Sequence, residues 1–190
     1  MNSFTRILLF CTLLILPRQA LVAEEITIGV SAAFTGAAKD LGIDLYRGAA
    51  SYIEHTNQRG GVNGKRIVIK AYDDGYDPGP AIQNTIKLIE SDRVLALFGY
   101  VGAPTVTRVL PLLKRYSEQS IHLLFPLSGA QPHRQPPYDQ YVFNLRASYE
   151  QETAGLVEHF HGHDLLATER QELTRQVGSP FPGPSDLCHA

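Results

Sequence analysis

Short apolar runs alternate along the chain with stretches in which apolar residues recur at helical spacing. The compact runs predict five strands, at 26–30, 66–72, 94–98, 121–125 and 141–145. Apolar residues three and four positions apart predict helices at 42–57, 78–90, 104–116 and 153–160. Strands and helices that alternate through short links are typical of a parallel sheet with right-handed crossovers. We therefore expect an α/β fold, an open parallel sheet with helices on both faces.

The stretch from 94 to 107 joins a strand, which we expect to be buried on both faces, to a helix start. The apolar run 94–98 is followed by a loop from Gly99 to Gly102, and Pro104 suits the first turn of the next helix. In open α/β sheets, ligands bind at the carboxyl ends of strands, and amides at helix starts attract anions. The pattern is compatible with an anion-binding loop, but this stretch alone favours the alternative that the glycines only make a tight turn, because a lone Gly-x-x-Gly is a weak signal.

The first 23 residues have the order of a secretory signal sequence. Arg6 supplies the positive flank, an apolar run follows from 7 to 16, and a small residue, Ala23, precedes Glu24. The run is shorter than the roughly 20 residues that a membrane span requires. We expect residues 1–23 to be removed on export; the alternative is an N-terminal membrane anchor.

Charge and cysteine content exclude some classes of protein. The net charge of −2 becomes −4 when Arg6 and Arg18 are removed with the signal sequence. We expect no nucleic-acid partner, because nucleic-acid binding requires a basic face. The same cleavage removes Cys11 and leaves Cys188 as the only cysteine. An internal disulfide is then impossible, so the stability must come from a packed core.

Two aspartates, Asp73 and Asp74, follow the second predicted strand. Strand-end aspartates can bind a metal or accept a phosphoryl group, but the acidic pair of a receiver domain follows the first strand. We instead expect these two to lie in a solvated loop or to act as charges at a helix start. We also expect the proline-rich stretch 131–138 to lie on the surface.

Hydroxyl and imidazole side chains make a hydrolase an alternative. Ser31, Thr35 or Ser128 could be the nucleophile and His122 its base. However, the chain has no Gly-x-Ser-x-Gly elbow. His122 also lies within an apolar strand pattern, which favours a packed histidine. We therefore expect no enzyme activity.

Two polar groups of residues follow the last predicted strand. Alternating histidines could be metal ligands on an extended segment, but no cysteine or acidic cluster accompanies them, so we expect no metal site. These histidines are His159, His161 and His163. An arginine and two hydroxyl residues could touch an anion or mark the crossing into another domain. They are Arg146, Ser148 and Tyr149.

Six segments are distinctive when taken together. They are I-T-I-G-V-S-A-A-F-T-G (26–36), N-Q-R-G-G-V-N-G-K-R-I (57–67), A-Y-D-D-G-Y-D-P (71–78), L-I-E-S-D-R-V-L-A-L-F-G-Y-V-G-A-P-T (88–105), F-P-L-S-G-A (125–130) and F-N-L-R-A-S-Y-E-Q-E-T (143–153). They resemble the first lobe of a type I periplasmic substrate-binding protein, of the branched-chain amino-acid-binding family that serves ABC importers. The most specific part is the Gly-Gly-Val-x-Gly turn followed by a strand and Asp-Asp. The resemblance covers about residues 25 to 160.

The resemblance implies two α/β lobes around a cleft that closes on the ligand by a hinge motion. In such proteins, loops after the third and fourth strands of the first lobe hold the carboxylate and ammonium of the ligand. Carried over by position, the ligand-binding residues are Tyr100, Val101, Gly102, Thr105, Leu127, Ser128 and Gly129, with Phe34 and Thr35 as a wall. The resemblance also implies a periplasmic location, an amino acid or related small ligand, a membrane permease as partner, and neither cofactor nor metal.

The chain departs from the family pattern in two places. Ala103 stands where the family more usually has a hydroxyl residue, which affects one ligand contact and the class of ligand. The family is also much longer, with a second lobe that should begin near Glu152. The composition changes after Phe160, and residues 161–190 are typical of a disordered tail. We expect a frameshift or premature stop; the alternative is a genuine one-lobe protein with a flexible tail.

A single lobe offers only half a cleft to the ligand. Losing contacts worth about 4 kcal/mol raises a dissociation constant roughly a thousandfold. We therefore expect a truncated and weakly functional copy of a solute-binding protein. The alternatives are a ligand-sensing or interaction lobe without a transport role, and a secreted hydrolase.

Overall fold

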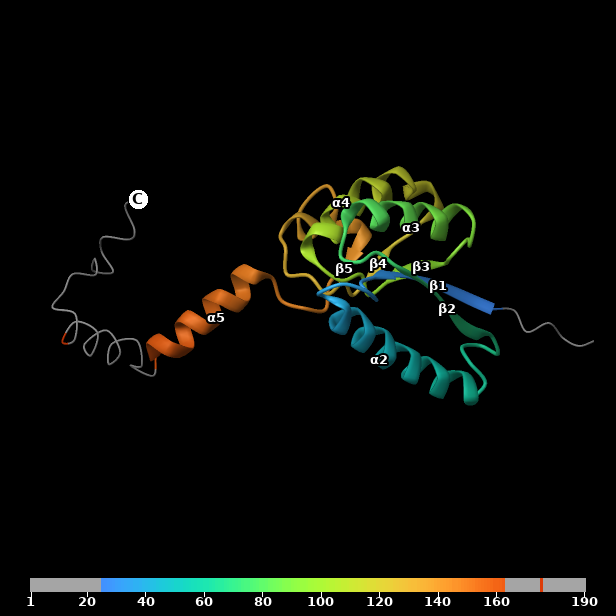
Figure 1. Ribbon diagram of the computed structural model, residues 1–190, viewed down its shortest axis with the longest axis horizontal. Coiled ribbons are helices and arrows are strands. Elements are labelled where there is room, and N and C mark those ends of the chain that lie inside the picture. Colours follow the sequence, from blue (N-terminus) through green and yellow to red (C-terminus); the bar gives the residue numbers. More distant parts are fainter. Residues whose placement is uncertain (1–24, 163–174, 176–190) are drawn as a thin grey trace, which may run out of the picture.

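A computed structural model describes residues 25–162 and residue 175. Five parallel strands form one sheet in the order β2-β1-β3-β4-β5 (Figure 1). The strands are β1 (Glu25–Ala32), β2 (Arg66–Asp73), β3 (Ala96–Phe98), β4 (Leu123–Leu124) and β5 (Val142–Phe143). The helices are α2 (Lys39–Gln58), α3 (Pro78–Glu90), α4 (Ala103–Arg115) and α5 (Tyr149–Gly162). The expected parallel α/β fold is confirmed.

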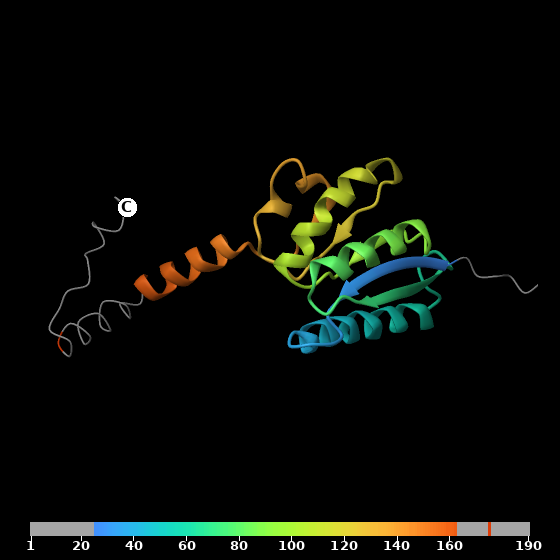
Figure 2. The ribbon, with the colours of Figure 1, turned by 45° about the horizontal axis from the view of Figure 1, so that its top comes forward.

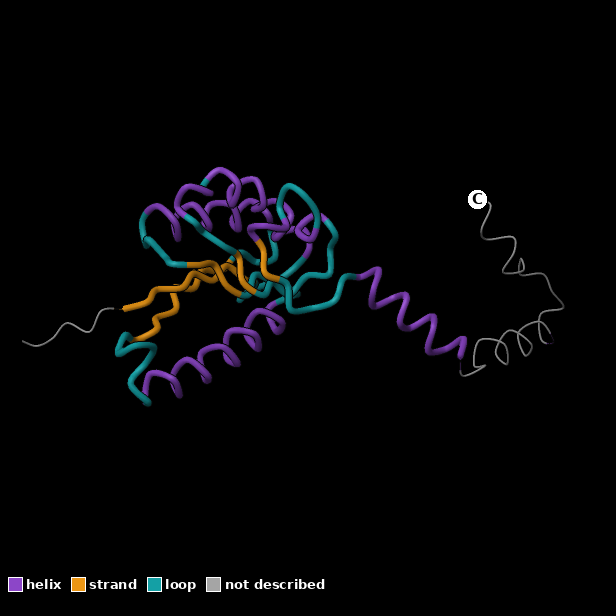
Figure 3. The backbone as a smooth tube through the Cα atoms, turned by 180° about the vertical axis from the view of Figure 1, so that it is seen from behind, coloured by secondary structure: helices purple, strands orange, loops and turns teal. Residues whose placement is uncertain are grey.

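Helices cover the two faces of the sheet unequally. Helix α2 lies along one face, and α3 and α4 lie side by side on the other (Figures 1 and 3). Helix α5 leaves this body and extends away from the sheet (Figure 2). None of the helices described is long and apolar enough to cross a membrane.

Local sequence explains where α3 and α4 begin and which face they bury. Asp77 caps α3, because its Oδ1 accepts the Gly79 N–H at 2.7 Å and Pro78 occupies the first helical position. Helix α4 likewise has a proline in its first turn, Pro104. Its fully buried residues recur at helical spacing: Thr105, Val106, Val109, Leu110 and Leu113. Each apolar side chain buried in this way stabilises the fold by about 1.5–3 kcal/mol.

The main core lies between the sheet and the pair α3 and α4. The row Leu97, Leu123 and Val142, in register on three neighbouring strands, is buried there. On each of these three strands, the residue that follows points to the opposite face of the sheet. On that face, α2 does not cover β4 or β5. Phe143, in that second row, is 54% exposed. The two faces of the sheet therefore differ in how fully they are buried.

Several predicted boundaries and burials differ from those observed. Helix α2 begins at Lys39, three residues before the predicted start, and α5 begins at Tyr149, four before. The last three predicted strands are shorter than expected, as β3, β4 and β5 show. The expectation that 94–98 is buried on both faces is wrong for Leu95, which is 65% exposed. Hydrophobicity predicted the run, but burial depends on which helix covers it.

Some predictions concern residues that the structure does not describe. The signal sequence predicted at 1–23 and most of the tail predicted at 161–190 lie outside the described residues. Cys11 and Cys188 lie there as well.

Candidate ligand-binding site

The loops that follow the parallel strands meet at one edge of the sheet. The loop after β3 and the loop after β4 are joined by backbone pairing, with Val101 and Leu127 in a parallel bridge. The Leu127 N–H donates to the Tyr100 carbonyl at 2.8 Å, and the Gly102 N–H donates to the Leu127 carbonyl at 3.2 Å. The structure therefore brings the sequence-predicted residues 100–102 and 127–129 side by side.

Asp73 organises the loop after β1, which carries the other two predicted site residues. Its Oδ1 accepts the N–H groups of Phe34 at 2.7 Å, Thr35 at 3.2 Å and Gly75 at 3.0 Å, and its Oδ2 accepts the Thr35 hydroxyl at 2.6 Å. Burial opposes ionisation, but these hydrogen bonds prevail and hold the pKa of Asp73 below its usual value. The Phe34 ring packs edge-to-face on Tyr46 of α2. Both residues are thus held on the α2 side of the edge.

Asp74 corrects the expectation of a solvated acidic loop. Its side chain is buried, 2% exposed, and accepts the Ser31 hydroxyl at 2.8 Å and the Tyr76 N–H at 2.9 Å. Burial raises the pKa of Asp74 although both hydrogen bonds act in the opposite direction. The chain turns back beneath the end of β1 and so buries the Asp74 carboxylate. The Ser31 hydroxyl and the Tyr76 N–H then supply the hydrogen bonds that water would otherwise make. Ser31, a candidate nucleophile, therefore has a structural partner.

The hydroxyls of two predicted site residues are engaged inside the fold. The Tyr100 hydroxyl is 2.9 Å from the Thr85 hydroxyl, and burial raises the pKa of Tyr100. The Thr105 hydroxyl donates to the Val101 carbonyl at 2.6 Å and lies 3.0 Å from the Gly102 carbonyl. These two side chains stabilise the loop after β3 from inside the fold. What this loop offers to a ligand is its backbone.

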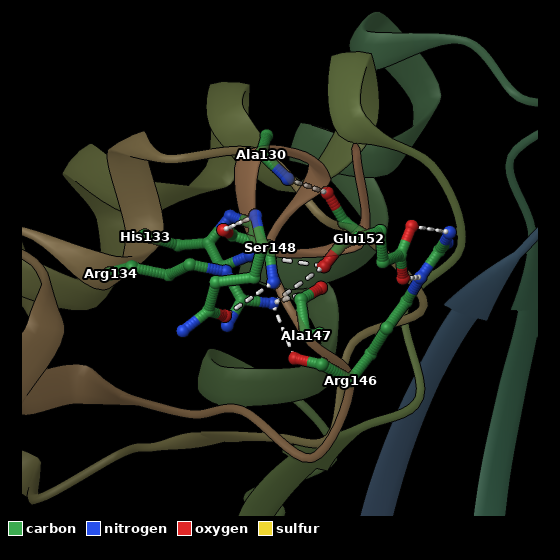
Figure 4. A network of polar contacts seen from close by, with 9 residues as sticks. Ala130, His133, Arg134, Arg146, Ala147, Ser148 and Glu152 are labelled. Carbon is green, nitrogen blue, oxygen red and sulfur yellow. Dashed lines mark hydrogen bonds and ion pairs between the residues drawn. The ribbon is translucent and has the colours of Figure 1, made fainter. Parts of the chain in front are cut away.

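Ser128 is fully buried and belongs to a polar network that includes Ala130, His133 and Arg134, which Figure 4 labels. Its Oγ accepts the Ala130 N–H at 3.3 Å, and its carbonyl accepts from Arg134 Nη2 at 3.2 Å and lies 3.3 Å from His133 Nε2. His133 is fully buried, so the expectation of an entirely surface stretch at 131–138 is wrong there. Burial, and then the neighbouring Arg134, lower the pKa of His133, so it supports the loop as a neutral ring.

Arg134 ties the same loop to the segment between β5 and α5. Besides Ser128, its Nη2 donates to the carbonyls of Arg146 at 2.7 Å and Ala147 at 3.2 Å (Figure 4). Burial, and then the charge of Arg146, lower the pKa of Arg134. Nothing in the local sequence distinguishes Arg134 from an exposed arginine, so sequence analysis missed it. Only its position between two distant loops reveals its role.

The residues after β5 mark a crossing rather than an anion site. Arg146 pairs with Glu152 through two contacts, of 2.7 and 2.9 Å. Ser148 and Gln151 form a reciprocal capping box at the start of α5. The Tyr149 N–H donates to the Gly129 carbonyl at 2.8 Å, and the Tyr149 ring occupies the space that a Gly129 side chain would fill. These contacts therefore favour the interpretation that the residues mark a crossing.

The candidates for catalysis and metal binding are not brought together. His122 precedes β4 at the opposite end of the sheet, half-buried against Phe143, with Nδ1 2.7 Å from the Ser120 carbonyl. Among the residues described, no group of three His, Cys, Asp or Glu side chains could hold a metal ion. The side chains of His161 and His163 lie outside the described part.

Two open hollows lie at the amino ends of the strands. Their volumes are about 490 and 370 Å³, and both are lined by Arg93, Val94, Gln119 and Ile121. Ligands of open α/β sheets bind at the carboxyl ends instead. The candidate site therefore remains the edge formed by the loops after β1, β2, β3 and β4.

Comparison with known proteins identifies the family. The family model described as periplasmic binding protein matches residues 25–167. The chain belongs to the periplasmic binding protein family.

Relatives of this periplasmic binding protein carry amino-acid-binding names. The amino acid binding protein of Pseudomonas aeruginosa is 29% identical over 54% of this chain and 26% of its own length. The Leu/Ile/Val-binding protein of Escherichia coli K12 is 27% identical over 63% of this chain and 31% of its own length. A possible leucine/isoleucine/valine-binding protein from Rhodopirellula baltica matches in structure with a TM-score of 0.67 and 29% identity, over 74% of this chain and 37% of that one. The chain thus spans about a third or less of the curated relatives.

Proposed function

We propose that the chain forms a ligand-binding lobe of a periplasmic solute-binding protein that delivers amino acids, or similar small carboxylates, to the permease of an ABC importer. The observation that carries the proposal is the pairing of the loop before α4 with the loop after β4. It joins a helix start and a glycine-containing loop at the carboxyl edge of the sheet, in a chain of this family. The relatives named above are binding proteins, which supports a role in binding rather than catalysis.

The start of α4 suits a carboxylate without a buried cation. The first intrahelical bond of α4 runs from Val106 N–H to the Gly102 carbonyl. The amides of Ala103 and Thr105 precede it and have no acceptor within the helix. Free amides and the helix dipole together favour a negative group. Val101, Gly102, Leu127 and Gly129 would contribute backbone groups, and the buried Ser128 side chain would hold the loop in place through the Ala130 N–H.

The first test adds a negative charge at the start of α4. Ala103→Asp places a carboxylate where the ligand carboxylate would bind, and an acidic residue in a first helical turn does not impair folding. We expect L-leucine, in an NMR titration of the ¹⁵N-labelled chain, to shift the amides of Gly102, Ala103 and Gly129 in the unaltered protein. In the variant, the affinity should fall about tenfold or more.

The matched control is Gly48→Asp, which adds the same charge on α2 where a side chain would meet no atom within 4 Å. We expect this control to bind leucine as the unaltered chain does. Equal affinity of the Ala103→Asp variant would contradict the proposed site, as would shifts confined to the amino ends of the strands.

A further inference from the structure

The ring of Tyr76, in the loop between β2 and α3, rests on the residue that precedes α4. A β-carbon placed on Gly102 would lie 2.4 Å from Tyr76 Cε2, 2.7 Å from Cζ and 2.9 Å from the hydroxyl oxygen. Only glycine leaves room for this contact. The hydroxyl end of the ring therefore reaches the start of α4, although the two residues belong to different loops.

The turn that carries Tyr76 fixes the direction of its ring. The φ angle of Tyr76 is +67°, a left-handed conformation that aromatic residues rarely adopt. Its N–H donates to Asp74 Oδ1, and the Asp77 N–H donates to the Asp74 carbonyl, both at 2.9 Å. Because Asp74 is itself buried and held by Ser31, the backbone that carries the ring is anchored from inside the fold.

The Tyr76 hydroxyl is also available. The hydroxyls of Tyr100 and Thr105 are taken up by other groups of the fold. Tyr76 is 37% exposed, and no described residue forms a hydrogen bond with its hydroxyl. A phenol O–H against Gly102, the residue that precedes α4, would add a side-chain donor to the backbone amides of the helix start.

We infer that Tyr76 is a specificity-determining residue whose hydroxyl donates a hydrogen bond to the ligand carboxylate at the start of α4. It supplies, from another loop, the hydroxyl that Ala103 does not carry. A charged carboxylate accepts a stronger hydrogen bond than the uncharged carbonyl of an ester or amide. The contact therefore selects for free acids. The inference rests on the proposed function, because it assigns one ligand group of that same site.

The test compares Tyr76→Phe with the unaltered full chain, using L-leucine and L-leucinamide as probes in the NMR titration. Phenylalanine keeps the ring on Gly102 and removes only the hydroxyl. We expect the affinity for leucine to fall about tenfold, the effect of losing one hydrogen bond to a charged group. We expect the affinity for leucinamide, which offers only an uncharged carbonyl as acceptor, to fall much less.

The control is Tyr52→Phe, on a side chain of α2 that is 74% exposed; it should leave both affinities unchanged. Unchanged leucine affinity in Tyr76→Phe would overturn the inference and leave the proposed function standing. Equal weakening of leucine and leucinamide would also overturn it, because the loss would then be one of loop structure. No amide shift in the unaltered chain at tens of millimolar leucine would overturn the proposed function and the inference together.

Discussion

At the scale of residues, the adjacent aspartates at the end of β2 occupy opposite environments. Asp73 is exposed and receives hydrogen bonds from the loop after β1, whereas Asp74 is buried. The pKa of Asp73 is lowered and that of Asp74 is raised. Two chemically identical neighbours should therefore affect stability with opposite dependence on pH.

Asp74→Asn should increase the free energy of unfolding at neutral pH. A raised pKa in the folded state gives stability that is complete below the ordinary value of 3.8 and is lost as the pH rises through the folded value. Asparagine stays neutral and can still accept from Tyr76 and donate to Ser31. The advantage of the variant should be smallest in acid and grow toward neutral pH, as measured by urea unfolding at several pH values.

Asp73→Asn is the matched control with the opposite sign. A lowered pKa gives stability that is present above 3.8 and lost as the pH falls through the folded value. This variant should be less stable than the unaltered chain at neutral pH, and the difference should shrink in acid. Parallel pH profiles for the two variants would contradict both assignments.

At the scale of elements, the loop after β4 and the start of α5 form one hydrogen-bonded unit. Arg134 holds carbonyls of both, the Tyr149 N–H donates to Gly129, and Gln131 contacts Glu150. The Arg146 guanidinium stacks on the Tyr149 ring, 5.2 Å from its centroid. The direction in which α5 leaves the sheet is thus coupled to the geometry of a candidate ligand loop.

Arg134→Met should destabilise the protein by about 2 kcal/mol, because it leaves carbonyls without the donor that now satisfies them. Methionine keeps most of the length and apolar stem of arginine. We expect faster hydrogen exchange at the Tyr149 amide as the crossing loosens. The control is Arg108→Met, an exposed arginine on α4. Unchanged exchange at Tyr149 would show that Arg134 does not link the two segments.

At the scale of the whole molecule, the described body offers one open edge to a ligand. At this candidate site the loops would contact a ligand from one side only, and the long helix α5 projects away from the sheet (Figure 2). A ligand held from one side remains partly in water, which weakens each polar contact. Affinity should depend on what else covers this edge.

A polypeptide of these 190 residues should accordingly bind L-leucine only in the millimolar range. Contacts worth about 4 kcal/mol, absent when a second surface does not close on the ligand, correspond to a thousandfold weaker dissociation constant. Equilibrium dialysis with labelled leucine measures this directly. A micromolar dissociation constant would contradict the prediction and show that the described lobe suffices.

Sequence reasoning succeeded where the signal is local. The alternation of apolar runs and helical periodicity predicted the order and type of every strand and long helix described. It erred at boundaries such as the start of α2, and at Leu95, because propensity does not reveal which helix covers a strand. The loops at 100–102 and 127–129 were placed together by resemblance, and the bridge between Val101 and Leu127 places them side by side in the structure.

The sequence by itself thus determined the α/β architecture, the family and the edge of the sheet at which to look for a ligand. Only the tertiary structure decided which polar groups are buried there and which remain free. Asp74 accepts the hydroxyl of Ser31 from β1, Arg134 donates to the Arg146 carbonyl twelve residues away, and Tyr76 lies against Gly102 from another loop. Such contacts arise from the packing of segments far apart in the chain, so no local pattern encodes them.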